Sequence, residues 1–354
     1  MQKNVRASIL AFLACVCAVA MLRSSCGDGA ESVRWSNAEE ASSEELSPSP
    51  EERIQQILLT PFRGDPDSHA VFFLDDYEDA AREIGKAGVP TLVRALESAD
   101  SQLRLKAVLC LIVIGPDAAP AVKALRPLLT SRVDRQAYWT IICLGEIGKA
   151  SMAAVPDLLA LLKHPRGCPF WEQIGETVGQ IAIKNGRLPK GLGELLNHKS
   201  PGARQGALFA LGECGKSAEP LVPKIIAMLR DRHVLVRIHA ALALGKIKRR
   251  LELTIPALVK AFDDPKASVR IAAARAIGDF GKDASSAVPH LIKLLGSPIS
   301  RVRYEAAVSL GKIGPAGGAA MPALKAALSD ENESVRQAAQ KALESLQASK
   351  RTGN

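Results

Sequence analysis

A repeat with a period of about 33 residues constrains this chain more than any other feature of its sequence. The string Leu-Gly-x-Ile-Gly, intact or with substitutions, recurs along the chain. Its last position is occupied by Gly85, Gly115, Gly148, Ala182, Gly215, Lys248, Gly281, Gly314 and Gln347. The interval between successive markers is constant from Ala182 onward and departs only slightly from that value before it. A fixed period in this range predicts a solenoid, in which each unit is stabilised by stacking on its neighbours.

Each unit contains the signals for two helices. A proline opens the first helix, at Pro90, Pro120, Pro156, Pro189, Pro223, Pro256, Pro289 and Pro322. Proline is favoured in the first turn of a helix, because its missing N–H would have no partner there. A turn, often with aspartate, then leads to a second helix that ends at the marker residue. Glycine suits that end because it adopts the left-handed conformation without strain.

The second helices carry the columns expected of a stacked core. Five residues before the marker all side chains are small, at Cys110, Cys143, Thr177, Ala210, Ala243, Ala276, Ser309 and Ala342. The next residue is aliphatic in every unit. We therefore expect one face of each second helix to pack closely against the neighbouring helices. Aromatic residues make up only 4% of the chain, which also favours an all-α class. We interpret Cys110, Cys143 and Cys214 as small core residues without disulfide bonds, since stacked helices lie about 8–10 Å apart.

Arginine forms another column, eleven residues before the marker. Its members are Arg104, Arg204, Arg237, Arg270, Arg303 and Arg336. In three units an aspartate lies six residues before the arginine, at Asp231, Asp264 and Asp330. We interpret the column as a ladder of structural Arg–Asp contacts between successive units. The alternative is a basic stripe that binds phosphates.

The unit P-x-L-x-x-L-L, a turn with Asp, then V-R-x-x-A-A-x-x-L-G-x-I-G resembles the HEAT repeat, in its short bacterial form related to phycobilin-lyase repeats. The resemblance covers residues 89–347 as about eight helical hairpins, after a degenerate N-terminal capping repeat at 51–88. It implies an α-solenoid whose second helices line a concave surface, and binding more than catalysis. We expect a right-handed superhelix, a monomer, and a disordered tail at 348–354.

The N-terminus predicts export. Lys3 and Arg6 precede an uncharged, mostly apolar run, Ser8–Leu22, which suits a signal peptide and is short for a membrane span of about 20 residues. Residues 1–26 are thus a signal peptide or a membrane anchor, with Cys26 as an alternative lipidation site. Residues 27–50 predict a disordered acidic tether. We expect the solenoid in a bacterial periplasm or tethered to a membrane.

Catalytic motifs are missing from the sequence. Deoxyhypusine hydroxylase is similar in architecture and binds iron through His-Glu pairs, but none of the six histidines here precedes a glutamate. GxSxG, Walker and HExxH motifs are also absent. We therefore expect no cofactor, no metal and no catalysis, with a lyase or oxidoreductase of the related families as the alternative. The net charge of +9 leaves a nucleic-acid-binding solenoid as another alternative, which the mixed signs of the concave columns disfavour.

The candidate binding site is a group of aromatic residues in two units that break the consensus. Tyr138, Trp139, Phe170 and Trp171 lie there, with Arg135 at the edge, where Ala137 and Trp171 replace the ladder arginine. Aromatic residues are favoured at interfaces, so we expect this surface to contact a protein or peptide partner. The alternative is that Phe170 and Trp171 fill the packing gap left by the arginine. We expect the column nine residues before the marker, which contains Trp139 and His239, to face solvent, and His239 to be an exposed residue without a role.

Overall fold

The computed structural model describes residues 49–59, 74–129, 135–163 and 169–351. The expected signal segment at 1–26 and the expected tether, up to residue 48, lie outside the described residues, as does the last part of the expected tail. Within the described ranges the chain folds into helices and contains no strand. The all-α prediction is confirmed.

The helices follow one another in pairs along the chain. Their bounds are α2 Pro50–Leu59, α3 Leu74–Ile84, α4 Val89–Leu96, α5 Ser101–Ile114, α6 Val122–Leu125, α7 Arg135–Ile147, α8 Val155–Leu162, α9 Trp171–Asn185, α10 Leu192–Leu195, α11 Pro201–Glu213, α12 Val222–Met228, α13 Val234–Ile247, α14 Leu251–Lys260, α15 Ala267–Asp279, α16 Val288–Leu294, α17 Ser300–Ile313, α18 Met321–Ala327 and α19 Glu333–Arg351. The pair α2 and α3 stands where the sequence predicted a capping unit, and α19 continues four residues beyond the last marker.

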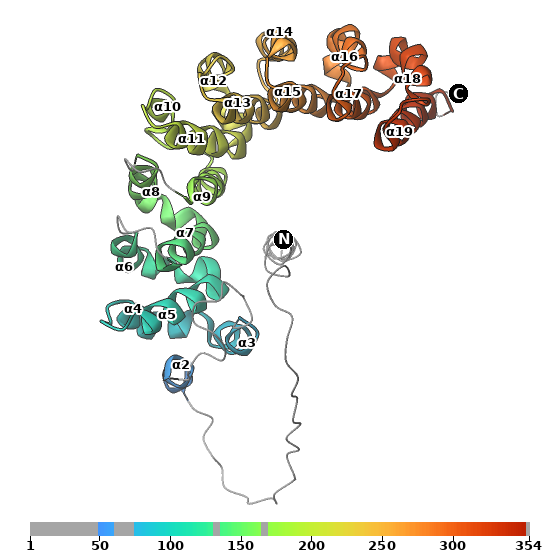
Figure 1. The fold of residues 1–354 in the computed structure, drawn as a ribbon. Coiled ribbons are helices and arrows are strands. Elements are labelled where there is room, and N and C mark those ends of the chain that lie inside the picture. The colour runs from blue at the N-terminus through green and yellow to red at the C-terminus, as the bar shows by residue number, and fades with distance from the viewer. Residues whose placement is uncertain (1–48, 60–73, 130–134, 164–168, 352–354) are drawn as a thin grey trace, which may run out of the picture.

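The pairs stack side by side into an open arc with two layers (Figure 1). The outer layer is formed by the first helices of the units, which are α4, α6, α8, α10, α12, α14, α16 and α18. The inner layer is formed by the second helices, which are α5, α7, α9, α11, α13, α15, α17 and α19. The chain is therefore an α-solenoid, and its second helices line the concave side, as the resemblance implied.

Successive units are joined by a residue with positive φ and, in most units, a short 3-10 helix. The marker glycines Gly85, Gly115, Gly148, Gly215, Gly281 and Gly314 all have positive φ. Lys248 also has a positive φ, of 51°, and lies in the left-handed helical region. A 3-10 segment of seven residues then follows five of these glycines, as in Gly281–Ala287. The prolines at 90, 156, 223, 289 and 322 lie in the first turn of a helix, as predicted. Pro120 instead lies inside a 3-10 segment, Pro256 lies inside α14, and Pro189 precedes α10.

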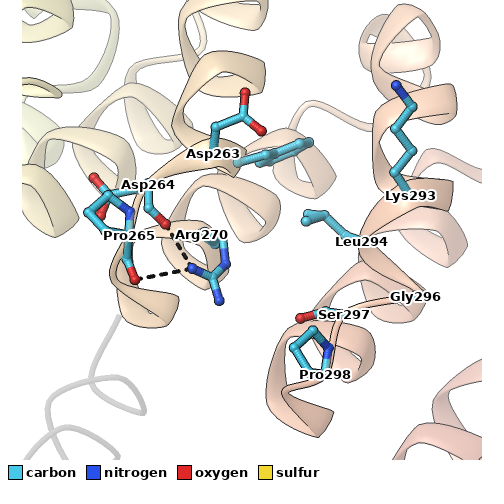
Figure 2. A pocket seen from close by; sticks show the side chains of 10 residues that line it. Asp263, Asp264, Pro265, Arg270, Lys293, Leu294, Gly296, Ser297 and Pro298 are labelled. Atoms are coloured by element: carbon cyan, nitrogen blue, oxygen red, sulfur yellow. Dashed lines mark hydrogen bonds between the residues drawn. The ribbon is translucent and has the colours of Figure 1, made fainter.

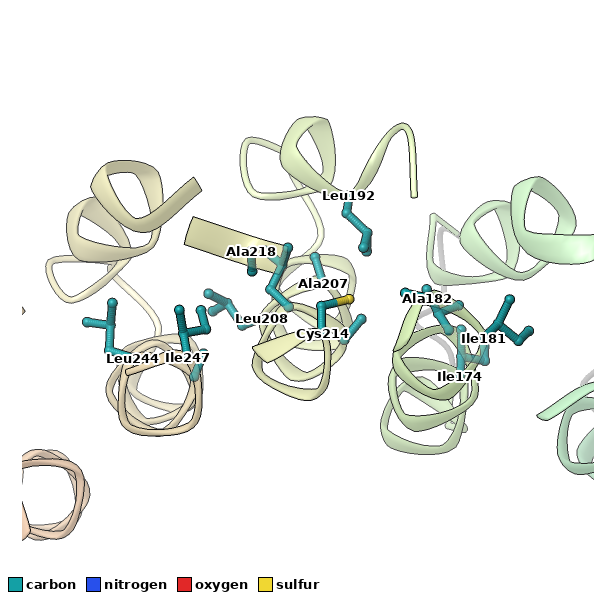
Figure 3. Packing of buried hydrophobic residues seen from close by; sticks show 14 of the residues in the cluster. Ile174, Ile181, Ala182, Leu192, Ala207, Leu208, Cys214, Ala218, Leu244 and Ile247 are labelled. Atoms are coloured by element: carbon teal, nitrogen blue, oxygen red, sulfur yellow. The ribbon is translucent and has the colours of Figure 1, made fainter. Parts of the chain in front are cut away.

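The core is a continuous apolar layer between the two rows of helices (Figure 3). Ile174 and Ile181 of α9, Leu208 of α11 and Leu244 of α13 are fully or almost fully buried in it. Cys110, Cys143 and Cys214 are buried and unbonded, as predicted, and burial raises the pKa of the Cys110 and Cys214 thiols to about 12. These thiols act as small apolar side chains.

Glycine allows α9 and α11 to approach each other very closely. A Cβ atom on Gly179 would lie 2.2 Å from Glu213 Cβ, and one on Gly175 would lie 3.0 Å from the carbonyl oxygen of Gly206. A real Cβ atom is essentially never closer than 3.0 Å to such an atom, so an alanine at 179 would force a shift, whereas one at 175 would make a tight contact with the Gly206 carbonyl. This close approach brings the aromatic side chains of neighbouring units together.

One stretch of the array, Ser101–Leu128, is long and apolar enough to cross a membrane by composition alone. Its helix ends at Ile114, however, because Gly115 turns the chain with φ 65°. Most of its residues are also buried against the neighbouring helices α4 and α7. Its hydrophobicity is that of a core helix.

Candidate functional site

The arginine column forms ion pairs across successive units. Arg204 contacts Asp231 at 2.8 Å, and Arg237 contacts Asp264 at 2.7 Å. Arg303 contacts Asp330 at 2.7 Å in the same way. In each case the aspartate lies in the turn of the following unit, at the same separation from its arginine along the chain. The contacts therefore hold neighbouring units together.

All six arginines of the column also fix the turn of their own unit. The Nη1 group of each donates a hydrogen bond to the carbonyl oxygen six residues earlier, on Ser98, His198, Asp231, Asp264, Ser297 and Asp330. Hydrogen bonds from Arg303 hold the pKa of Asp330 below its ordinary value, against the opposing effect of burial. An arginine that already binds a carboxylate of the next unit and a carbonyl oxygen of its own turn is not available for phosphate. These contacts therefore favour the structural interpretation over the basic stripe.

The ladder has irregular members. Arg104 donates from Nε to Gln136 Oε1 at 3.3 Å instead of to a carboxylate. Within the described residues, Arg336 bonds only to main-chain carbonyl oxygens, and Arg270 does the same. Arg270 lacks an acidic partner because Ser297 occupies the turn position at which the regular members meet an aspartate.

The predicted aromatic residues meet as rings. Tyr138 lies on α7 with its ring centroid 5.4 Å from that of Trp139 and 5.1 Å from that of Phe170. Phe170 directly precedes α9, and Trp171 is the first residue of that helix. Arg135 begins α7, one turn before Tyr138, and is half-buried. The structure thus places all five predicted residues on or beside two second helices of the inner layer.

Two further rings extend this group, and the sequence did not identify them. Trp171 contacts His239 of α13, with centroids 4.8 Å apart, and Phe209 of α11, with centroids 6.2 Å apart. We call Tyr138, Trp139, Phe170, Trp171, Phe209 and His239 the aromatic cluster. All six side chains are half-buried. The cluster therefore spans four successive second helices.

The prediction for His239 was wrong, and so was the one for its column. His239 is half-buried, and burial, together with the charge of Lys246, lowers its pKa. In the same column Lys106, Ala272 and Glu305 are buried. Lys106 Nζ donates to the carbonyl oxygen of Leu58. The physical reason is that neighbouring second helices pack along this column, so it faces the adjacent unit instead of solvent.

The two interpretations of the aromatic residues apply to different members of the cluster. Phe170 and Trp171 pack against the apolar core, as the packing alternative expected, and Trp139, which was expected to face solvent, packs against it too. Within the described part of the chain, Tyr138 and Phe209 are half-buried without joining that core. These two rings are therefore the members of the cluster that are best suited to test binding separately from core packing.

Acidic side chains surround the cluster. Burial raises the pKa of Glu176, and the charges of Glu213, Glu172 and Glu146 raise it further, while Lys246 acts in the opposite direction. Lys246 pairs with Glu213, and its ammonium lies 5.0 Å from the centroid of the Phe209 ring. The surface therefore combines exposed ring area with an excess of negative charge. Among the described residues, no three His, Cys, Asp or Glu side chains are grouped so that they could hold a metal ion.

Comparison with known families decides the kind of repeat. A family model described as HEAT repeats matches residues 189–268 and 255–344. Residues 189–344 carry HEAT repeats. The match falls where the repeat period is most regular and includes Phe209 and His239, whereas the other four members of the aromatic cluster lie in the worn units on its N-terminal side. We call the stack of helical pairs from α4 to α19 the HEAT array, after its matched part.

Solved structures support the solenoid fold of the HEAT array. Kap121p bound to Nup53p is similar with a TM-score of 0.54 and 14% identity, over 86% of this chain and 42% of that chain. Kap121p bound to the extreme C-terminus of the phosphatase Cdc14p gives a TM-score of 0.53 with the same identity and coverage. YibA of E. coli gives a TM-score of 0.47 and 20% identity, over 80% of this chain and all of YibA. At these identities the likeness shows the fold alone, and this chain spans less than half of Kap121p. No curated protein matches the sequence.

Proposed function

We propose that the HEAT array is a non-catalytic scaffold that binds a protein or peptide partner on its inner face, at the aromatic cluster. The observation that carries the proposal is the run of six half-buried rings across α7, α9, α11 and α13. Large aromatic side chains at a surface supply most of the binding energy of typical interfaces. Rings that are partly accessible on four adjacent second helices form two neighbouring groups of three, which a single partner segment could contact together.

The surroundings of the cluster suggest the chemistry of the partner. Burial is the main cause of the raised pKa of Glu176, and the charges of Glu213, Glu172 and Glu146 raise it further, so several carboxylates repel one another at a partly desolvated surface. A cationic side chain would relieve this repulsion, and it could also stack on a ring, as Lys246 does on Phe209. We therefore propose a partner segment that carries Lys or Arg beside an apolar anchor. Kap121p, which shares the fold, has been solved with Nup53p and with the C-terminus of Cdc14p, so a solenoid of this kind accommodates protein partners.

The test uses the two rings that do not pack on the core. Peptides selected from a displayed random library against the full chain would be measured for binding to wild type, Tyr138→Ala and Phe209→Ala. We expect either substitution to weaken binding at least about tenfold, or about 1.4 kcal/mol, with little change in melting temperature. Tyr304→Ala on α17 is the control for a general loss of packing, because that half-buried ring packs against the core and lies outside the cluster.

Two results would contradict the proposal. One is a set of selected peptides whose affinity neither Tyr138→Ala nor Phe209→Ala changes. The other is an equal loss in Tyr304→Ala, which would indicate a general effect on the fold. Enrichment of acidic peptides instead of Lys- or Arg-containing ones would leave the site in place and overturn the proposed charge of the partner.

Export and a monomeric state are proposed on the sequence alone. Export rests on the pattern of residues 1–50, and the monomeric state rests on the repeat pattern. Mass spectrometry of the protein from its native cell tests the first, since a soluble cytosolic form with an intact Met1 would contradict export. Light scattering of the purified chain tests the second.

A further inference from the structure

A surface pocket lies at one of the turns where the arginine ladder lacks its carboxylate, the turn opposite Arg270. Arg204, Arg237 and Arg303 each have a carboxylate partner in the turn of the next unit, whereas the corresponding residue for Arg270 is Ser297. Serine is neutral and too short to replace the carboxylate, and its Oγ accepts a hydrogen bond from the N–H of Ile299. Within the described residues, Arg270 bonds only through Nη1, to the carbonyl oxygens of Asp264 and Pro265.

The pocket has a volume of about 380 Å³ and lies between two turns (Figure 2). Phe262 and Pro265 line one side, where α15 begins, and Leu294, Ser297 and Pro298 line the other, where α16 ends. Figure 2 shows the Arg270 guanidinium beside Asp264 and Pro265, across the pocket from Ser297. The Nε and Nη2 groups that bind aspartate in the other units are therefore the groups without a partner here.

The charges around the pocket favour a single negative charge. Lys293 lines the pocket, is exposed and forms no ion pair among the described residues. Asp264 is already neutralised by two hydrogen bonds from Arg237, at 2.7 and 3.0 Å. The carboxylate of Asp263 points away from Arg270 in Figure 2. The ammonium of Lys293 also points away from Arg270 in Figure 2, so Arg270 alone remains to bind a ligand, while the nearby aspartates repel a doubly charged anion such as phosphate more strongly than a carboxylate.

We propose that this pocket binds a carboxylate of a partner polypeptide, which completes the ladder by pairing with Nε and Nη2 of Arg270. The geometry is the one that the fold already uses between Arg237 and Asp264. Arginine binds carboxylates through two parallel N–H groups, so the site selects a carboxylate over an amide of the same shape. The proposal does not depend on the aromatic cluster, which lies on other helices.

The test follows the side-chain Nε–H signals of the full chain by NMR during titration with blocked aspartate, N-acetyl-aspartate N-methylamide. We expect the Arg270 signal to shift in a saturable way. The Arg237 and Arg303 signals should not move, because Asp264 and Asp330 already bind these two guanidinium groups. Blocked asparagine should cause no shift. N-acetylglycine distinguishes the source, since a stronger response to it assigns a chain terminus and a stronger response to blocked aspartate assigns an acidic side chain.

Ser297→Asp is the variant that supplies the carboxylate from within the chain. It should move the Arg270 signal toward the position of the Arg237 signal and weaken binding of blocked aspartate at least about tenfold, because a tethered carboxylate has an effective concentration in the millimolar range or above. The proposal is overturned if blocked aspartate leaves the Arg270 signal unchanged. It is also overturned if blocked asparagine or inorganic phosphate shifts that signal as strongly.

Discussion

Asp264→Asn should destabilise the HEAT array by about 3 kcal/mol, the cost expected for breaking a largely buried ion pair. The carboxylate of Asp264 accepts two hydrogen bonds from Arg237 and one from the N–H of Lys266, at 2.7, 3.0 and 2.8 Å. Only 12% of the Arg237 side chain and 9% of the Asp264 side chain are exposed. Asparagine keeps the size but removes the charge, and its NH₂ group faces an N–H donor of Arg237.

The magnitude follows from the burial of the pair. Removing one partner of a buried ion pair costs about 3–5 kcal/mol, because the other charge is left without compensation. Here the lower end applies, since Arg237 keeps its hydrogen bond to the carbonyl oxygen of Asp231 and is not completely buried. At about 2–4 °C per kcal/mol for a domain of roughly this size, the melting temperature should fall by about 6–12 °C.

The assay is thermal and urea denaturation followed by circular dichroism, with Asp263→Asn as the matched control. Asp263 is the adjacent residue, is exposed, and has no ion pair or hydrogen bond through its side chain among the described residues. Its substitution should change stability by no more than about 0.5 kcal/mol. Equal losses in Asp264→Asn and Asp263→Asn would refute the role of the ladder.

The pH dependence provides a second criterion. Burial raises the pKa of Asp264, but the hydrogen bonds from Arg237 and Lys266 outweigh it, so the folded-state pKa lies below the ordinary value of about 3.9. The stability that this carboxylate contributes is complete above that ordinary value and is lost as the pH falls through the lowered folded-state pKa. The difference between wild type and Asp264→Asn should therefore shrink below about pH 4. A difference that stays constant as the pH falls through this range would show that the charge of Asp264 is not the cause.

Three further substitutions test the packing of the array by urea denaturation. Trp139→Ala should cost about 2 kcal/mol, since the ring is half-buried and packs on the core; no loss would place Trp139 on a solvent-facing column. Lys248→Gly should add about 0.5–1 kcal/mol by relieving the strain at φ 51°, whereas a loss would indicate no strain there. Gly179→Ala should cost at least about 1–3 kcal/mol, because its Cβ would overlap Glu213. Gly318→Ala, with no atom near the added Cβ, is the control and should be close to neutral.

The sequence alone determined the solenoid, because periodicity is a local property. A helix repeats its faces every three to four residues, so the small and aliphatic columns of the second helices identify their buried side without any tertiary information. Most of the marker glycines were identified for the same reason, since a residue with positive φ ends the second helix there and glycine adopts such a conformation without strain. Lys248 shows how strongly the fold imposes this ending, because it adopts the left-handed region at a marker without glycine.

Only the tertiary structure decided which side chains meet across units. From the sequence we expected arginine to pair with aspartate, but only the stacking shows that each partner lies in the turn of the following unit. It therefore also shows that Ser297 stands where Arg270 would otherwise meet a carboxylate. Phe209 and His239 join Trp171 for a related reason, since glycine lets α9 and α11 approach closely. A repeat period fixes how each helix is built, whereas the distance and angle between neighbouring helices depend on the side chains that fill the space between them.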